Sequence, residues 1–340
     1  MQKVQIHLDV LVQAHLLLLP FLHDQSSPPS GDNLMKETIF EDSYSKFLTA
    51  CREKGDVHIE DLIALMHMMQ ANEMDNHTTI CGQNGCGKSY VLLMILKEFM
   101  RGNDPSANWM SNLMLADKTV DDMVQFLLQK ENTMLAIDEL NQYLYYKQHA
   151  EDEQNHLMKQ IELARSKRIA MIGCVRDPRK LTVNYRNGKM SIVIWLVDRY
   201  KNGGSYGAVF VANPAVESID KFGFMNISPD LIDFEELRVT FENLPSFIGY
   251  MRVPDARNYL TEEEIRIYKK AKSKSMAQAH LNYCMKRVGK RKMSLPDFMD
   301  ELEPLIPIIG EDDARTLATR ATELANFRTP RGKAKDQEED

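Results

Sequence analysis

The sequence lacks the features that mark secreted and membrane proteins. Its 5 cysteines are scattered and none forms a C-x-x-C pair, which argues against a disulfide framework and favours free thiols in a reducing compartment. The apolar stretch near the N-terminus, Leu8–Leu22, is interrupted by polar residues, and it is too short and too polar to span a bilayer. We therefore expect a cytoplasmic protein without a membrane partner, whose first residues dock on its own body or on a neighbouring subunit.

A strong excess of positive charge is also lacking. The 340 residues carry a net charge of -7, with 44% hydrophobic and 27% charged residues, the balance of an ordinary soluble globular protein. Any contact with nucleic acid must therefore come from a local basic patch. One such patch is the basic segment, Arg266–Lys292, which holds ten basic residues and no acid. This pattern fits a solvated helix face as well as it fits a surface that binds backbone phosphates.

The most specific motif in the chain is Gly82–Ser89, which fits the phosphate-loop pattern G-x-x-x-x-G-K-[ST] without a mismatch. The apolar segment Thr78–Cys81 leads into it and a helical pattern from Tyr90 leads out of it. In this strand–loop–helix context, backbone N–H groups and the helix N-terminus bind phosphate oxygens. We expect Lys88 to reach the β- and γ-phosphates of ATP and the Ser89 hydroxyl to ligate Mg²⁺.

Two adjacent acids follow a short apolar run. The run Thr133–Ile137 is typical of a strand buried in a parallel sheet, and Asp138 and Glu139 come directly after it. Ligands of open α/β sheets bind at the carboxyl ends of the strands. We therefore expect Asp138 to hold Mg²⁺ through water and Glu139 to activate the attacking water as a general base. The residues predicted to bind the nucleotide are Gly82, Gln83, Asn84, Gly85, Cys86, Gly87, Lys88, Ser89, Tyr90 and Asp138.

Helical and strand patterns alternate along the first two thirds of the chain. The alternation predicts an α/β fold with a RecA-like P-loop NTPase core, a mainly parallel sheet flanked by helices, with N-terminal helices over 35–73 and a helical C-terminal module. The element order leaves room for the strand Ile169–Val175 to lie between the phosphate-loop strand and the acidic strand. The other expected elements are strands at Trp109–Leu115, Ser191–Val197 and Tyr206–Ala212, and helices at 90–100, 119–129 and 141–166.

Shifts in composition divide the chain into four segments. We expect an N-terminal docking segment and linker over 1–33, a P-loop ATPase domain over 34–230 and a mostly helical module with the basic segment over 231–328. The last residues, 329–340, have the composition of a disordered tail. No internal repeat is visible in the sequence.

With these motifs in place, residues 75–215 resemble P-loop ATPases of the division that has an additional strand and a catalytic glutamate. Within it they are similar to the FtsK/HerA-type DNA translocases and the viral genome-packaging ATPases. The matching pieces are Leu163–Arg168, Ile169–Pro178 and Asn184–Trp195. The chain departs from that family at Arg176, where glutamine is common.

The resemblance implies an oligomeric ring, a pentamer or a hexamer, that moves double-stranded DNA through its centre and docks on a portal or capsid protein, in the host cytoplasm if the protein is viral. It also implies an arginine that reaches the γ-phosphate of the neighbouring subunit, where its charge stabilises the transition state. The candidates are Arg165, Arg168 and Arg186.

Two other functions stay open at this point. An ATP-switch DNA-binding protein, which loads or regulates a replication or transposition complex, would need the same nucleotide site and the same basic segment. A small-molecule kinase would share the phosphate loop, but it has no use for a water-activating acid at Glu139. A motor is expected to hydrolyse ATP quickly and to be stimulated by double-stranded DNA, whereas a switch is expected to be slow and to respond to a protein partner.

Overall fold

The computed structural model describes residues 33–104, 106–144, 152–199, 204–212, 222–223 and 239–327. The predicted docking segment, apart from Asn33, and the predicted disordered tail lie outside these residues. The chain divides into two compact units, the first formed by Met1–Met114 and Lys118–Leu260 and the second by Leu115–Asp117 and Thr261–Asp340.

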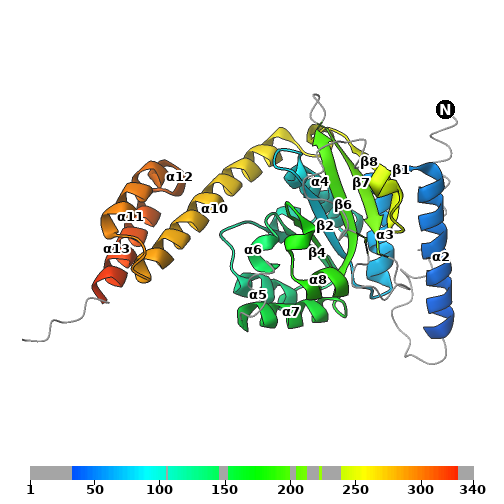
Figure 1. Cartoon of the computed structure of the whole chain (residues 1–340), viewed down its shortest axis with the longest axis horizontal. Helices are drawn as coiled ribbons and strands as arrows, with labels where there is room; N and C mark the ends of the chain where they lie inside the picture. The colour runs from blue at the N-terminus through cyan, green and yellow to red at the C-terminus, as the bar shows by residue number, and fades with distance from the viewer. Residues whose placement is uncertain are drawn as a thin grey trace, which may run out of the picture. The chain divides into compact units, whose positions relative to one another are not determined.

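An eight-stranded sheet forms the centre of the described part of the first unit, in the order β1-β8-β7-β6-β2-β5-β4-β3 (Figure 1). Its strands are β1 Asp56–Val57, β2 His77–Gly82, β3 Leu113–Met114, β4 Thr133–Ile137, β5 Ile169–Cys174, β6 Met190–Arg199, β7 Ser205–Val211 and β8 Phe247–Val253. β7 runs antiparallel to both of its neighbours, and the other pairs are parallel. The acidic strand β4 is separated from the phosphate-loop strand β2 by β5, as predicted.

Helices cover both faces of this sheet, which confirms the predicted fold class. They are α2 Asn33–Lys54, α3 Ile59–Ala71, α4 Lys88–Asn103, α5 Val120–Gln129, α6 Asn141–Leu144, α7 Asp152–Ala164 and α8 Val183–Gly188. Alternate strand residues, such as Leu135 and Ile137 of β4, share one buried cluster with α5 and α7. α3 and α4 pack together, and α4 contacts β2, β4 and β5. The two faces of each central strand are therefore both buried, as the continuous apolar runs indicate.

Two predicted elements differ from the structure. The strand expected at Trp109–Leu115 is a 3₁₀ turn over Trp109–Asn112, followed by the two-residue β3. The cause is Asn112, whose side-chain amide donates to the Met134 carbonyl of β4 at 2.9 Å and to the Thr133 hydroxyl at 2.6 Å. This side chain takes the place that the backbone N–H of a longer β3 would occupy. Within the helix expected over 141–166, the structure describes α6 and α7, the residues between them lie outside the described part, and residues 165–168 form a turn instead of helix.

The boundary between the two units also lies later than predicted. Residues beyond 230 were expected to be mostly helical, yet β8 pairs with β7 and the first unit continues to Leu260. Pro245 and Pro254 flank β8, and a proline is tolerated there because it interrupts no hydrogen bond within the strand. β8 is held further by α2, where the Arg52 guanidinium donates to the Pro245 carbonyl at 2.8 Å.

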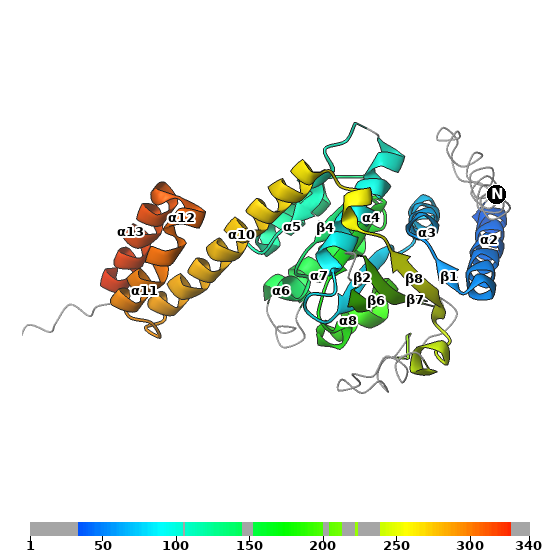
Figure 2. The same cartoon turned by 90° about the horizontal axis from the view of Figure 1, so that it is seen from above.

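The described part of the second unit is helical, as expected for a C-terminal module (Figure 2). Its helices are α10 Glu262–Gly289, α11 Leu295–Leu302, α12 Ile306–Ile309 and α13 Glu311–Phe327. Leu281, Phe298 and Leu317 lie in a common buried cluster. The starts of α10 and α11 are fixed by capping boxes in which Thr261 and Ser294 accept from the backbone N–H three residues later. Among the described residues, no helix is long and apolar enough to cross a membrane.

Candidate nucleotide site

The loop between β2 and α4 depends on glycine at several positions. Gly82, Gly85 and Gly87 have φ angles of 138°, 88° and 94°, a region that residues with a side chain rarely adopt. Space is limited as well, because a Cβ atom at Gly82 would lie 2.2 Å from the Leu196 carbonyl oxygen and one at Gly87 would lie 2.4 Å from the Ser205 hydroxyl. Gly82 and Gly87 are therefore required both by conformation and by close packing, and Gly85 by conformation alone.

Neighbouring strands hold this loop in place. The buried Ser205 hydroxyl, at the start of β7, donates to the Cys86 carbonyl at 2.8 Å. The Gly82 N–H donates to the Arg176 carbonyl at 3.2 Å, in the segment that follows β5. Cys86 itself is buried, so its thiol belongs to the packing of the loop. Sequence reasoning missed Ser205, since a lone serine far along the chain carries no signal that it will meet the phosphate loop.

Lys88 lies at the start of α4, directly after the loop. Its ammonium group donates to the carbonyl oxygens of Gly82 and Gln83, both at 2.8 Å. These bonds hold the positive charge against the loop, next to the N-terminus of α4. A helix N-terminus and a lysine at one place form a binding position for phosphate. Lys88 therefore lies beside the loop, and its role at the phosphates stays a prediction.

Ser89 and Asp138 meet although 49 residues separate them in the sequence. The Ser89 hydroxyl, in the first turn of α4, donates to an Asp138 carboxylate oxygen at 2.6 Å. Asp138 is only 3% exposed, and its backbone N–H donates to the Met114 carbonyl at 3.0 Å. A hydroxyl and a carboxylate are oxygen ligands of the kind that Mg²⁺ prefers. The pair therefore fits the predicted magnesium position.

Glu139 follows Asp138 at the same carboxyl edge of the sheet, and it is exposed. The turn that carries it is tied to β5, because the Leu140 N–H donates to the Cys174 carbonyl at 2.8 Å. The two acids thus have different surroundings, one buried against Ser89 and one open to solvent. This difference suits a buried metal ligand beside a carboxylate that contacts water.

The three candidate trans-acting arginines lie away from this edge. Arg165 and Arg168 are in the turn that precedes β5, and Arg186 is in α8, which precedes β6. Because β2, β5 and β6 are parallel, the amino ends of β5 and β6 lie at the edge opposite the phosphate loop. Arg168 also forms an ion pair with Glu73 at 3.2 Å. The structure does not bring these arginines to the chain's own loop.

A different arginine does contact the loop. Arg176, exposed after the end of β5, donates from its guanidinium to the Gln83 side-chain oxygen at 3.4 Å. The next arginine along the chain, Arg179, binds Asp177 through two nitrogens at 2.8 and 2.9 Å. Burial alone would raise the pKa of Asp177, but the hydrogen bonds and charge of Arg179 outweigh it and hold that pKa below its usual value. Asp177 therefore stays charged and fixes Arg179.

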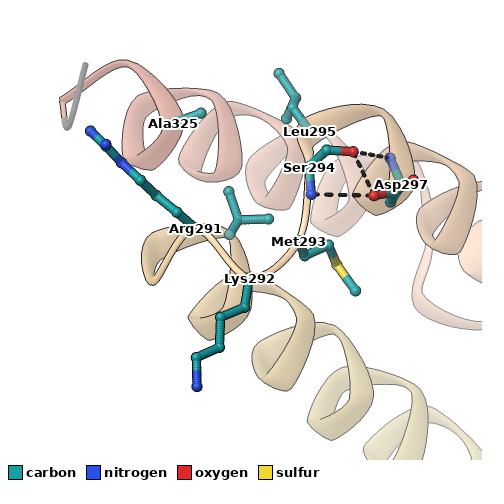
Figure 3. A pocket seen from close by; sticks show the side chains of 8 residues that line it. Arg291, Lys292, Met293, Ser294, Leu295, Asp297 and Ala325 are labelled. Atoms are coloured by element: carbon teal, nitrogen blue, oxygen red, sulfur yellow. Dashed lines mark hydrogen bonds between the residues drawn. The ribbon is translucent and has the colours of Figure 1, made fainter. Parts of the chain in front are cut away.

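A pocket also occurs in the second unit, and Figure 3 shows the side chains that line it. Its polar side chains do not converge on one point. Arg291 and Lys292 extend away from each other in this view. The Ser294 hydroxyl donates to the Asp297 carboxylate at 2.6 Å, so both polar groups serve the cap of α11. Val288, Leu295 and Ala325 contribute apolar surface. We therefore place the candidate site at the phosphate loop.

Comparison with known proteins agrees with this placement. The model of the ATPase family associated with various cellular activities (AAA) matches residues 78–197, a stretch that includes the phosphate loop, both acids and the three candidate arginines. This part of the chain is a P-loop ATPase domain of the AAA type, and the observed sheet is that of a RecA-like P-loop NTPase.

Similar solved structures include the N-terminal domain of zonular occludens toxin from Neisseria meningitidis, which is 16% identical, with a TM-score of 0.29, over 41% of this chain and 84% of that one. Another is the genome packaging NTPase from Sulfolobus turreted icosahedral virus 2 in complex with ATP-gammaS, which is 14% identical, with a TM-score of 0.30, over 40% of this chain and 92% of that one. No curated protein matches the chain.

Proposed function

We propose that this protein is an ATP-hydrolysing motor that translocates or packages double-stranded DNA as a ring of identical subunits, using ATP and Mg²⁺. The observation that carries the proposal is the contact of Ser89 with Asp138 at 2.6 Å, with Glu139 exposed beside it. Asp138 follows β4, and β5 lies between β4 and the phosphate-loop strand β2. This arrangement supports the roles that we propose at this edge of the sheet, a metal ligand at Asp138 and a water-activating acid at Glu139.

The chain's own residues have distinct roles in this reaction. The loop N–H groups and Lys88 bind the phosphates, and Ser89 and Asp138 would hold Mg²⁺, which neutralises charge on the β- and γ-phosphates when bound. Glu139 takes a proton from the attacking water as general base. Arg176, which contacts the loop at Gln83, is placed to add positive charge beside the γ-phosphate.

The ring is supported by the placement of the trans-arginine candidates. Arg165 is exposed, and its side chain forms no hydrogen bond or ion pair among the described residues. Because it lies at the edge opposite its own phosphate loop, any nucleotide site that it serves is the site of another subunit. Arg168 is paired with Glu73 and Arg186 is partly buried. Arg165 is therefore our first choice for the arginine that stabilises a neighbour's transition state.

DNA binding is assigned to the basic segment, most of which lies on α10. Near its start, Arg266 pairs with Glu263 at 2.7 Å and Lys274 pairs with Asp313 at 3.3 Å, and both acids lie outside the segment. The other end of the segment is densely cationic and exposed, at Lys286, Lys290, Arg291 and Lys292. Such a surface suits contact with the DNA backbone, whose phosphates bind cations regardless of sequence. A portal or capsid protein is the partner that a packaging motor would dock on.

The alternative is an ATP switch that loads or regulates a DNA-bound complex. One experiment separates the two: ATP turnover of the full chain with and without double-stranded DNA, beside particle images of the same sample, with Lys88→Ala as the inactive control. Fast turnover that DNA stimulates, together with rings in the images, supports the motor. Slow turnover that DNA leaves unchanged and a protein partner raises would replace the motor with the switch.

A further inference from the structure

Three side chains that ligate metals meet in the second unit. His280 and Cys284 are four residues apart on α10, and Glu301 lies on α11. The same imidazole nitrogen, Nε2 of His280, lies 2.8 Å from a carboxylate oxygen of Glu301 and 3.6 Å from Sγ of Cys284. All three ligand atoms lie within 4.8 Å of one another. A nitrogen, a sulfur and an oxygen from two helices thus converge on one point.

One side of this cluster is buried between the helices, and the other side is exposed to solvent. Cys284 is 1% exposed and belongs to the buried cluster between the helices, together with Leu281, Phe298 and Leu302. The side chains of His280 and Glu301 are each 47% exposed. An ion at this point would have its thiolate ligand fixed by the core and would keep a position open to water. The two exposed ligands can adjust because solvent surrounds them.

We propose that His280, Cys284 and Glu301 bind one zinc ion, with water as the fourth ligand. Zinc binds Cys at about 2.3 Å and His or carboxylate at about 2.0 Å, so tetrahedral ligands lie about 3.5 Å apart for S and N and about 3.3 Å apart for N and O. The S–N separation is close to the 3.6 Å between Cys284 Sγ and His280 Nε2 in the structure. The N–O separation requires the Glu301 carboxylate to move by about 0.5 Å, because it now lies 2.8 Å from His280 Nε2. A thiolate with an imidazole selects zinc over magnesium or calcium.

The function of this ion would be to join α10 to α11. The described helices of the second unit share a small buried cluster, in which Cys284 is one of ten residues. Small helical units rarely gain enough stability from the core alone, and a bound metal often supplies the rest. The zinc would lock the basic helix against its neighbours, so the charged surface would keep one shape.

Binding requires the thiol to lose its proton. Zinc takes the place of this proton, so zinc binding should release protons, which calorimetry in two buffers measures.

The test is a titration of the full chain with Zn²⁺, and with Co²⁺ as a coloured substitute, in the absence of nucleotide because ATP competes for metal. We expect one ion per chain and a thiolate-to-cobalt charge-transfer band. His280→Gln and Glu301→Gln should each weaken zinc binding by about 100-fold or more, because even the loss of an outer partner of a metal ligand costs 10–100-fold. Glu303→Gln, the same change on an exposed residue two positions further, should bind as the wild type does.

The ordinary alternative is an ion pair between His280 and Glu301 beside a core cysteine. It predicts that His280→Gln and wild type take up zinc equally, and that the cobalt complex shows no thiolate band; either result overturns the proposal. Cys284→Ser removes a buried group and can unfold the unit by itself, so the two exposed ligands carry the test. A rise in Tm on adding zinc to the wild type, absent in His280→Gln, would support the join between α10 and α11.

Discussion

The two units use charge in opposite ways. At the nucleotide site of the first unit, the charged groups are fixed by hydrogen bonds at defined atoms, Asp138 to Ser89 and Lys88 to Gly82. In the second, the cations are many and exposed, and they lie mostly along one helix. A nucleotide must be held at defined atoms, which requires fixed geometry, whereas a nucleic-acid backbone is bound through charge density alone. We therefore expect single substitutions to matter greatly for nucleotide hydrolysis in the first unit and little for DNA binding by the second.

The sharpest test of this contrast is Lys88→Ala. The change removes the ammonium group that the loop carbonyls hold, and with it the main neutralising charge for the phosphates. We expect hydrolysis to fall to background in a turnover assay. Lys130→Ala, the same change on an exposed residue of the same unit, should keep wild-type turnover. If Lys88→Ala also keeps it, the nucleotide site lies elsewhere.

Arg165→Ala is expected to have the next largest effect. The loss of an arginine that acts in trans lowers hydrolysis by about 10³-fold or more, while ATP binding should persist because the chain's own loop is intact. Mixing this variant with Lys88→Ala should restore part of the turnover, since each mutant lacks a different half of the interface. Arg320→Ala, which changes an exposed arginine of α13, is the control and should keep wild-type turnover. Absence of rescue at every mixing ratio would remove Arg165 from the mechanism.

Glu139→Gln should separate binding from chemistry. The amide keeps the shape of the side chain but cannot take a proton, so hydrolysis should fall by about 100-fold or more. ATP affinity, measured by equilibrium binding, should change little, because the contact of Ser89 with Asp138 remains. Glu131→Gln, at the other end of β4 and also exposed, is the matched control. An equal loss of binding and hydrolysis would contradict the role of a general base.

The smallest change in activity for each charge removed is expected for DNA binding by α10 and the turn that follows it. Changing Lys286, Arg287, Lys290, Arg291 and Lys292 to serine should weaken binding of all DNA sequences alike. It should also flatten the dependence of log affinity on log salt by about 0.9 for each DNA phosphate that the variant no longer neutralises. Arg315→Ser with Arg320→Ser, on α13, should leave that slope nearly unchanged. An unaltered slope in the five-fold variant would make the basic segment a solvated helix face.

Much of the first unit could be predicted because its signals are local. The phosphate loop, the acidic strand and β5 each appear as short runs of sequence, and the predicted order of β2, β5 and β4 is confirmed. β8 was missed because a seven-residue strand of mixed burial, containing Gly249, is recognised only through its pairing with β7. For the same reason the boundary was placed near 230 rather than at 260.

Within the candidate site, the positions of the residues that belong to a motif were predictable, and the residues that support the loop were not. Lys88, Ser89 and Asp138 lie together as the motif requires. Ser205 supports the loop from a strand 119 residues away, a contact that depends on tertiary packing and leaves no trace in local pattern. Arg176 was noted only as a departure from a family, and its contact with Gln83 gives it a place in the site.

The sheet ends on both sides in a strand of only two residues, β1 at one edge and β3 at the other. Long exposed edges invite backbone pairing between copies, and very short ones prevent it. Among the described residues, the outermost strands therefore offer only two residues each along which the sheet could continue into another copy. In the proposed ring we expect the subunits to meet through side chains, which can separate and meet again without breaking a continuous ladder of backbone hydrogen bonds.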